Sequence, residues 1–213
     1  MQTTICENLT MRHSLHAEGF GIRLRPVRMD DAAFIVWLRN LAHVLGRVGD
    51  SATDLTRQQA WLNSYFTREG DYYFIVETLG GIPVGTHAIY DANGTSAEHG
   101  RLIMRPEVPA VMPCLVNAFD LAFGPMGFTE LRGTVVSTNQ EVLSLHRKLG
   151  CRRIKIEPGG RVIGSKVVDM VHFVLLPEDW AKARERLLPL ARQAEREVLQ
   201  LEQTQEQNLR RSK

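Results

Sequence analysis

The stretch 98–151 constrains the fold more than any other part of the chain, because strand-like and helix-like patterns alternate along it. A short apolar run at 102–104 predicts a strand, and a compact loop follows at 105–112. Large apolar residues then recur at helical spacing over 115–123, before a second strand-like run at 131–136. A strand, a crossover helix and a further strand in this order favour two parallel neighbours in one sheet.

The helix after the second strand begins with Thr138-Asn139-Gln140-Glu141, which is typical of a capping box with Thr138 as the N-cap. Val142, Leu145 and Leu149 are predicted to share its apolar face. A helix that begins just past a strand presents unpaired N–H groups and the positive end of its dipole. This stretch therefore predicts an edge of the sheet that suits phosphate.

The remaining patterns predict an α/β protein with a mixed sheet covered by helices. Strands are expected at 22–27, 72–76, 82–90, 102–104, 131–136, 152–157 and 167–176. Turns are expected at Gly80-Gly81, Asn93-Gly94 and Pro158-Gly159-Gly160. Helices are expected to begin at Asp30-Asp31, at Asp54 or Thr56, near Pro113 and at Thr138. Two successive hairpins give an antiparallel meander, which the crossover helix extends by a parallel strand.

The segment 178–213 is charged and has helical periodicity, and Pro189 is expected to break or kink the helix near Leu188. An apolar face is predicted beyond it, made of Leu190, Ala191, Ala194, Val198 and Leu201. This face either lies on the helix's own domain or forms a contact between subunits. A homodimer is therefore one expectation.

The chain has 213 residues, which suffices for one domain at 21–182, between an N-terminal arm at 1–20 and a C-terminal helical extension at 183–213. Its net charge of +2 implies no strong field toward nucleic acid or membrane. We find neither a signal-peptide pattern nor the roughly 18 apolar residues that span a bilayer. Three widely separated cysteines predict no disulfide framework and no metal site, which favours a reducing cytoplasm.

Three segments together resemble the GCN5-related N-acetyltransferases (GNAT), in particular the branch of the ribosomal-protein acetyltransferases RimJ and RimL. They are the strand, loop and helix at 100–123, the Asn139…Leu145-His146-Arg147-Lys148-Leu149-Gly150 segment, and Val168 to Leu175 followed by Glu178-Asp179-Trp180. The family often ends the second segment with Phe, where this chain has Cys151. The resemblance covers roughly 20–182 and implies a mostly antiparallel mixed sheet of six to seven strands flanked by helices. It also implies acetyl transfer from acetyl-CoA to an amine.

The resemblance places the diphosphate of the cofactor at Glu107–Met112, where the family usually has R/Q-x-x-G-x-G/A. Both glycines are replaced here, and Pro109 and Pro113 have no N–H. Backbone N–H groups supply such contacts, so four residues are expected to provide them: Val108, Ala110, Val111 and Met112. The alternative is a tight turn from strand to helix with no ligand.

The resemblance also assigns residues to the rest of the cofactor. The strand edge at Ile103, Met104 and Arg105 is expected to pair with the pantetheine arm, and Arg105 either contacts phosphate or forms a surface ion pair. Asn139 occupies the position of the family's cofactor-contacting asparagine, and the alternative is that it only caps the helix. No metal is expected.

Three residues are candidates for proton transfer. His146 stands where many GNAT enzymes have the tyrosine that protonates the thiolate, and an imidazolium can donate to a thiolate because its pKa is the lower of the two. Glu98 or His99 is the candidate base, at the level where the family often places a glutamate. The alternatives are a structural histidine and a solvent-facing strand edge.

Trp37, Arg39 and Asn40 resemble the helix end of GNAT enzymes that acetylate nucleotide-linked amino sugars, where an aromatic ring stacks and an arginine holds a phosphate. Core packing is the alternative for Trp37. We expect direct attack by a small amine, since no cysteine has a recognisable base beside it. A protein N-terminus is the second acceptor, and a GNAT-shaped binding module without catalysis is the alternative function.

Overall fold

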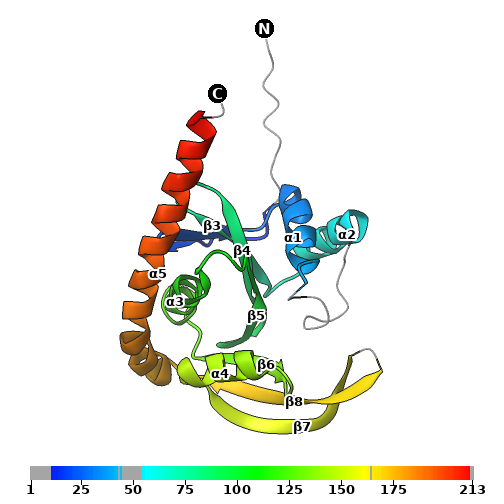
Figure 1. Ribbon diagram of the computed structural model, residues 1–213. Coiled ribbons are helices and arrows are strands. Elements are labelled where there is room, and N and C mark those ends of the chain that lie inside the picture. The colour runs from blue at the N-terminus through cyan, green and yellow to red at the C-terminus, as the bar shows by residue number, and fades with distance from the viewer. Residues whose placement is uncertain (1–10, 43, 45–53, 164, 212–213) are drawn as a thin grey trace.

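The computed structural model describes residues 11–42, 44, 54–163 and 165–211, which build one eight-stranded sheet with helices on both faces (Figure 1). The strand order is β1-β2-β3-β4-β5-β6-β8-β7, and β5 and β6 are its one parallel pair of neighbours among the described residues. The strands are β1 (Ala17–Gly19), β2 (Ile22–Pro26), β3 (Tyr72–Thr78), β4 (Pro83–Asn93), β5 (Ser96–Met104), β6 (Glu130–Val136), β7 (Arg152–Ile163) and β8 (Lys166–Leu175).

The predicted fold class and the parallel crossover are confirmed. The sheet has one strand more than expected because the short β1, inside the predicted arm at 1–20, pairs with β2; residues 1–10 of that arm lie outside the described ranges. The helices are η1 (Met29–Asp31), α1 (Ala32–Arg39), α2 (Leu55–Phe66), α3 (Val111–Phe123), α4 (Gln140–Lys148) and α5 (Pro177–Arg211).

Helices cover both faces of the sheet. Figure 1 shows α3 and α5 on one side of β3, β4 and β5, and α1 and α2 on the other. The sequence of β3 explains this arrangement, because Phe74 and Val76 pack with α3 while Tyr73 and Ile75 pack with α1 and α2. A strand buried on both faces reads as a continuous apolar run, as Tyr73 to Val76 does.

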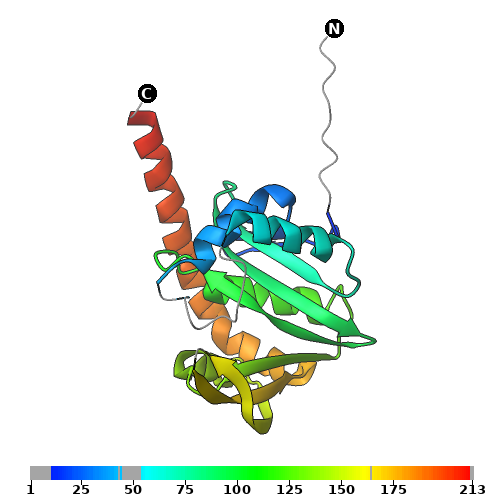
Figure 2. The ribbon, with the colours of Figure 1, turned by 90° about the vertical axis from the view of Figure 1, so that its right-hand side faces the viewer.

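The turn predicted at Pro158-Gly159-Gly160 is wrong. β7 continues to Ile163, which pairs with Lys166 of β8, and the register shifts between Glu157 and Arg161. The proline and the glycines are therefore accommodated as a bulge in an edge strand, where a missing N–H and a flexible backbone are tolerated. Figure 2 shows the resulting long hairpin at the lower end of the molecule.

Pro189 was predicted to break or kink the helix; the break is wrong, because α5 is helical on both sides of it, and the kink stays a prediction. Five apolar residues of α5 are buried against the main core and hold the helix to its own domain: Trp180, Ala183, Leu187, Ala191 and Val198. Leu190, which was predicted to share that face, is 48% exposed. Near its far end Glu202 accepts the N–H of Gly80 at 2.7 Å.

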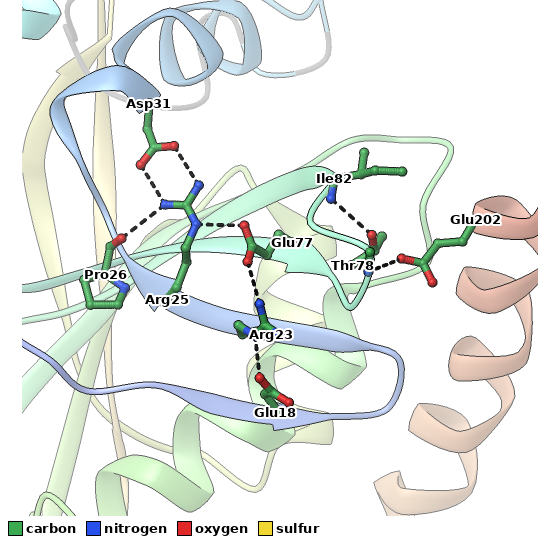
Figure 3. A network of polar contacts seen from close by, with 10 residues as sticks. Glu18, Arg23, Arg25, Pro26, Asp31, Glu77, Thr78, Ile82 and Glu202 are labelled. Carbon is green, nitrogen blue, oxygen red and sulfur yellow. Dashed lines mark hydrogen bonds and ion pairs between the residues drawn. The ribbon is translucent and has the colours of Figure 1, made fainter. Parts of the chain in front are cut away.

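A buried ion-pair network joins β2, β3 and η1 (Figure 3). The guanidinium of Arg25 donates to both oxygens of Asp31 at 2.8 Å and to Glu77 at 2.7 Å. Arg23 extends the network outward from Glu77 to Glu18. The side chain of Arg25 is only 15% exposed, whereas that of Arg23 is 35% exposed. Arg25 therefore neutralises two carboxylates that water cannot fully solvate.

We expect Arg25→Met to lower the free energy of unfolding by about 3 kcal/mol, because Asp31 and Glu77 lose their buried counter-charge. The measurement is urea denaturation at neutral pH. Arg23→Met is the matched control, since it removes a guanidinium from the outer part of the same network, and a smaller loss is expected. Equal losses in the two variants would contradict the assignment.

Candidate functional site

A cavity of about 930 Å³ opens where β5 and β6 part from each other. The two strands pair only over 96–98 and 130–132. Farther along, both strands line the cavity instead of bonding to each other, together with α4 and the loop before α3. Strand edges without partners leave N–H and C=O groups unpaired, so an extended ligand can bind here as an additional strand does.

A bulge in β5 accompanies this separation. Thr86 of β4 faces Ile103 while Ala88 faces Gly100, so β5 has one extra residue between these pairs. Arg101 takes up the extra length with φ of 51°, in the left-handed region that residues other than glycine rarely adopt. The hydroxyl of Thr86 donates to the carbonyl of Arg101 at 2.8 Å and ties the bulge to β4.

The side chain of Arg101 is held by an ion pair and by three aromatic rings. Its guanidinium donates to the two oxygens of Asp71 at 2.6 and 3.0 Å. It also lies over the rings of Trp61, Tyr73 and Tyr90, at centroid distances of 5.1, 5.5 and 4.5 Å. Arg101 and these rings line the end of the cavity nearest α2. The sequence analysis did not single out Arg101, because an arginine in a strand is ordinarily a surface residue.

The loop before α3 keeps fewer free N–H groups than expected. Val108 donates its N–H to the carbonyl of Arg105 at 3.1 Å, and Ala110 donates to Val108 at 2.8 Å. Val111 and Met112 form the first turn of α3, where no intrahelical carbonyl can accept from them. Two of the four expected donors are thus used within the loop, and two remain at the positive end of a 13-residue helix.

Most of the side chains predicted to meet the cofactor line the cavity, namely Ile103, Met104, Arg105, Val108, Val111 and Asn139. Ala110 is fully buried in the core, and Met112 packs against that core, so Met112 leaves the cavity open. Arg105 lines the cavity and forms the surface ion pair considered for it, with its Nε donating to Glu107 at 2.6 Å; its contact with phosphate stays a prediction.

Asn139 both caps a helix and lines the cavity. It is the N-cap of α4, one residue later than the predicted Thr138, and its Oδ1 accepts the N–H of Val142 at 3.3 Å. Asn139 also lines the cavity. Capping uses only the oxygen of the side-chain amide. The N–H₂ group of the same amide takes no part in the cap.

Two of the three candidates for proton transfer lie together at the cavity. His99 on β5 and His146 on α4 both line it, and their rings stack at a centroid distance of 5.3 Å. Glu98 does not line the cavity; it is the cross-strand partner of Tyr90. A third histidine, His87, stacks against His99 from β4 at 6.1 Å.

Burial governs the protonation of these three imidazoles. It lowers the pKa of His87 to about 4, and it lowers the pKa of His99 well below the ordinary value, with further lowering from His146 and His87. Burial also lowers the pKa of His146, against a hydrogen bond from its Nδ1 to the carbonyl of Val142 at 2.8 Å. All three rings are therefore neutral near pH 7.

Of the three residues predicted to bind the acceptor, one lines the cavity. Arg39 lines the cavity, but Trp37 and Asn40 do not. Trp37 is 45% exposed, so it is not a core residue, and its ring lies 5.6 Å from the guanidinium of Arg105. Asn40 is exposed at the end of α1 and donates its side-chain N–H to the carbonyl of Val36.

Gly133 and Arg161 are cavity neighbours that the sequence analysis missed. A Cβ at Gly133 would lie 2.9 Å from Nε2 of His146 and 3.0 Å from Nε2 of His99. Arg161 reaches the cavity from the long β7 that the predicted turn at 158–160 excluded. An isolated glycine inside a strand is a known signal of close approach, so Gly133 was open to prediction; Arg161 was not.

Solved structures with a similar fold are acetyltransferases by their names. FdhC, a nucleotide-linked sugar GNAT, gives a TM-score of 0.67 at 23% identity, over 84% of this chain and 98% of its own. Spermidine N-acetyltransferase from Vibrio cholerae, in complex with CoA and spermine, gives 0.69 at 17% identity, over 76% and 99%. A GCN5-related N-acetyltransferase from Brucella melitensis gives 0.70 at 15% identity, over 87% and 90%. No protein-family model and no curated protein sequence matches the chain.

These likenesses show that the chain has the fold of the GNAT acetyltransferases. The RimJ/RimL branch stays a prediction. Within the described ranges, no helix has the length and apolar character needed to cross a bilayer. The same ranges contain no group of three or more histidine, cysteine or acidic side chains placed to hold a metal.

We expect acid to destabilise the protein through His87, which is fully buried. Its pKa is about 4 when folded and about 6.5 in an unfolded chain, so falling pH protonates the unfolded state first. The stability that neutral His87 permits is present above pH 6.5 and is lost as the pH falls toward 4.

Between pH 7 and pH 5 the wild type should therefore lose about 2 kcal/mol more unfolding free energy than His87→Leu does. Urea denaturation of both proteins at both pH values measures this difference, and changes in packing cancel in it. Identical pH dependence would remove His87 from the explanation.

Proposed function

We propose that this protein transfers an acetyl group from acetyl-CoA to the primary amine of a small acceptor by direct attack. The observation that carries the proposal is the open cavity between the separated strands β5 and β6, which reaches the uncapped start of α3. Acetyl-CoA would supply an activated thioester carbonyl. The chain supplies the strand edge at Ile103 and Met104 for the pantetheine arm, and Val111 and Met112 N–H groups for the diphosphate.

The cysteines support direct attack over an acyl-enzyme. Burial raises the pKa of Cys151 to about 12 and raises that of the fully buried Cys114 further from its ordinary value. Both therefore stay protonated and are weak nucleophiles. Cys6 lies outside the described residues. The amine itself is then the attacking group, and its proton must pass to a residue at the cavity.

His99 and His146 are the proposed sites of that proton transfer, since both rings line the cavity. Glu98, which was predicted as an alternative base, does not line it. A neutral imidazole is a competent proton acceptor, and imidazolium is acidic enough to protonate a departing thiolate.

The charges at the acceptor end favour an amine that carries an anionic group, such as a nucleotide-linked amino sugar. Arg39, Arg101 and Arg161 line the cavity, and no aspartate or glutamate does so among the described residues. A polyamine or the basic tail of a protein acceptor would meet these cations without a compensating carboxylate. Arg39 and Arg161 have no ion-pair partner within the described part of the chain, whereas Arg101 pairs with Asp71.

Aromatic rings at the same end suit a sugar or a base. Trp61, Tyr73 and Tyr90 line the cavity beside Arg101. Burial raises the pKa of Tyr73, and the nearby Arg39 acts against it; both residues line the cavity. A flat or ring-shaped acceptor with an attached phosphate would use both features.

Replacing Val111 by proline tests the cofactor site, because proline lacks the N–H but is favoured at the first position of a helix. We expect Val111→Pro to weaken acetyl-CoA binding by roughly tenfold or more, the effect of losing a hydrogen bond to a charged group. Val111→Ala keeps the N–H and should bind as the wild type does. Calorimetric titration measures both, with thermal melting as a check of folding.

Absence of binding at millimolar acetyl-CoA in the wild type would contradict the transferase and favour a GNAT-shaped binding module. Equal affinities of Val111→Pro and Val111→Ala would keep the transferase but remove the start of α3 from the diphosphate site. The two results separate the function from the seating of the cofactor.

Replacing Arg39 by alanine tests the acceptor class. With a phosphate-bearing amino sugar, we expect Arg39→Ala to lower kcat/KM roughly 10- to 100-fold, and with a neutral amino sugar to change it little. Arg57→Ala on α2 is the matched control, because that guanidinium is exposed and bonds only Asp54 among the described residues. A faster reaction with spermidine than with any anionic amine would overturn the proposed class. Thiol release with a panel of amines provides the measurement.

A further inference from the structure

Two imidazole rings from different elements converge on one glycine. His99 comes from β5 and His146 from α4, and their rings stack with 28° between the planes. A Cβ at Gly133 of β6 would lie within 3.0 Å of Nε2 of both rings. Both Nε2 atoms therefore border one small volume, which exists because residue 133 has no side chain.

The hydrogen bonding of His146 fixes which of its nitrogens borders that volume. Its Nδ1 lies 2.8 Å from the carbonyl of Val142, which can only accept, so Nδ1 carries the hydrogen. Nε2 then carries a lone pair. Nε2 of His146 is buried and has no hydrogen-bond partner, and the ring as a whole is only 5% exposed. An unpartnered buried acceptor costs stability, which an active role in proton transfer would explain.

The surroundings leave the pair without a counter-charge. His87 stacks on the far side of His99, the ring of Phe119 on α3 packs against His99, and that of Phe173 on β8 packs against His146. Cys151 contacts His146 through the backbone, where its N–H donates to the carbonyl of His146 at 3.0 Å. No carboxylate or guanidinium forms a hydrogen bond or an ion pair with either ring in the described part of the chain. Two positive charges on adjacent rings would therefore repel each other unscreened.

We propose that His99 and His146 act as one proton-accepting pair that binds a single proton, and that Gly133 is the positioning residue that keeps their Nε2 atoms together. This inference rests on the proposed acetyl transfer and adds to it a mechanism for the proton. The amine nitrogen forms the new C–N bond as the C–S bond breaks. The proton lost by that nitrogen passes to the pair, directly or through one water molecule, and then to the thiolate sulfur, so amide and free thiol are the products.

The assignment changes the role predicted for His146. A ring whose Nδ1 is committed to Val142 cannot act as an acid from Nε2 until it has first received a proton there. His146 therefore acts as an acid only after the pair has taken the proton of the amine. This order ties the two proton transfers to each other.

The pairing is tested without any substrate, by ¹⁵N-histidine NMR titration of the full chain. In His146→Gln, we expect the pKa of His99 to rise by about one pH unit or more, because the repulsion from the second ring is gone. In the wild type, ¹⁵N shifts should show His146 with its hydrogen on Nδ1. An unchanged pKa of His99 would overturn the pair, and so would a wild-type His146 with its hydrogen on Nε2.

Gly133→Ala tests the positioning residue. The methyl group would intrude between the two Nε2 atoms, so we expect kcat to fall roughly 100-fold or more, with acetyl-CoA affinity unchanged and the acidic limb of the pH–rate profile shifted. Arg132→Ala alters the neighbouring residue of β6, whose side chain bonds Glu130 at the surface, and should keep the wild-type rate. An unaltered rate and profile in Gly133→Ala would also overturn the proposal.

The proposed acetyl transfer and the imidazole pair can be contradicted separately. Coupled titration of His99 and His146 without acetyl transfer to any amine would remove the proposed function while the paired imidazoles remain. Measurable transfer with independent titration of the two rings would retain the function and remove the pair.

Discussion

The ion pair between Arg101 and Asp71 is the interaction on which the cavity depends. A non-glycine residue in the left-handed region costs about 1–3 kcal/mol, so the bulge at Arg101 persists only if other contacts hold it. A buried, two-pronged bond to Asp71 and three aromatic rings around the guanidinium provide those contacts. The bulge then carries β5 away from β6 beyond 98, and the space for a ligand follows from that divergence.

The same logic explains how a loop without glycine borders an open cavity. Val108 and Ala110 place their side chains in the core, at 8% and 0% exposure, and their N–H groups bond within the loop. The loop thus has few N–H groups left, and in the proposed site the first turn of α3 would bind the anion. Glycine-rich loops offer more backbone donors to a phosphate. In the proposed site two N–H groups and the nearby Arg105 would share that task, which would shift part of the binding from hydrogen bonds to charge.

The elements that local patterns determine were predictable, and those that tertiary contacts determine were not. The hairpin predicted at Asn93-Gly94 forms, with Asn93 paired to Ser96 and the turn one residue later at 94–95, because Gly94 tolerates its φ of 57° whatever surrounds it. Pro158-Gly159-Gly160 offers the same local preference, yet pairing of 161–163 with 166–168 across β8 converts a turn into a bulge. Pro189 is held inside α5 because Leu187 and Ala191 on either side are buried against the core.

The same distinction between local patterns and tertiary contacts applies to the residues of the candidate site. His99, His146 and Asn139 were proposed from the family resemblance, which places them by the order of helices and strands, and all three line the cavity. Arg101 escaped, because its importance lies in a cluster of Asp71 with rings from α2, β3 and β4 that no spacing in the sequence reveals.

The free-energy cost of burying histidines without hydrogen-bond partners distinguishes a packing role from a chemical role. His87 leaves both ring nitrogens without partners, and an unsatisfied buried polar group costs about 1–3 kcal/mol. A leucine would fill a comparable volume without that penalty, so core packing alone does not account for imidazole at 87 and 146. What imidazole adds is a nitrogen that can accept a proton, with a pKa that burial lowers from its ordinary value. An interior with no counter-charge keeps such a proton short-lived, which suits a group that must pass it on to sulfur within the same reaction rather than store it.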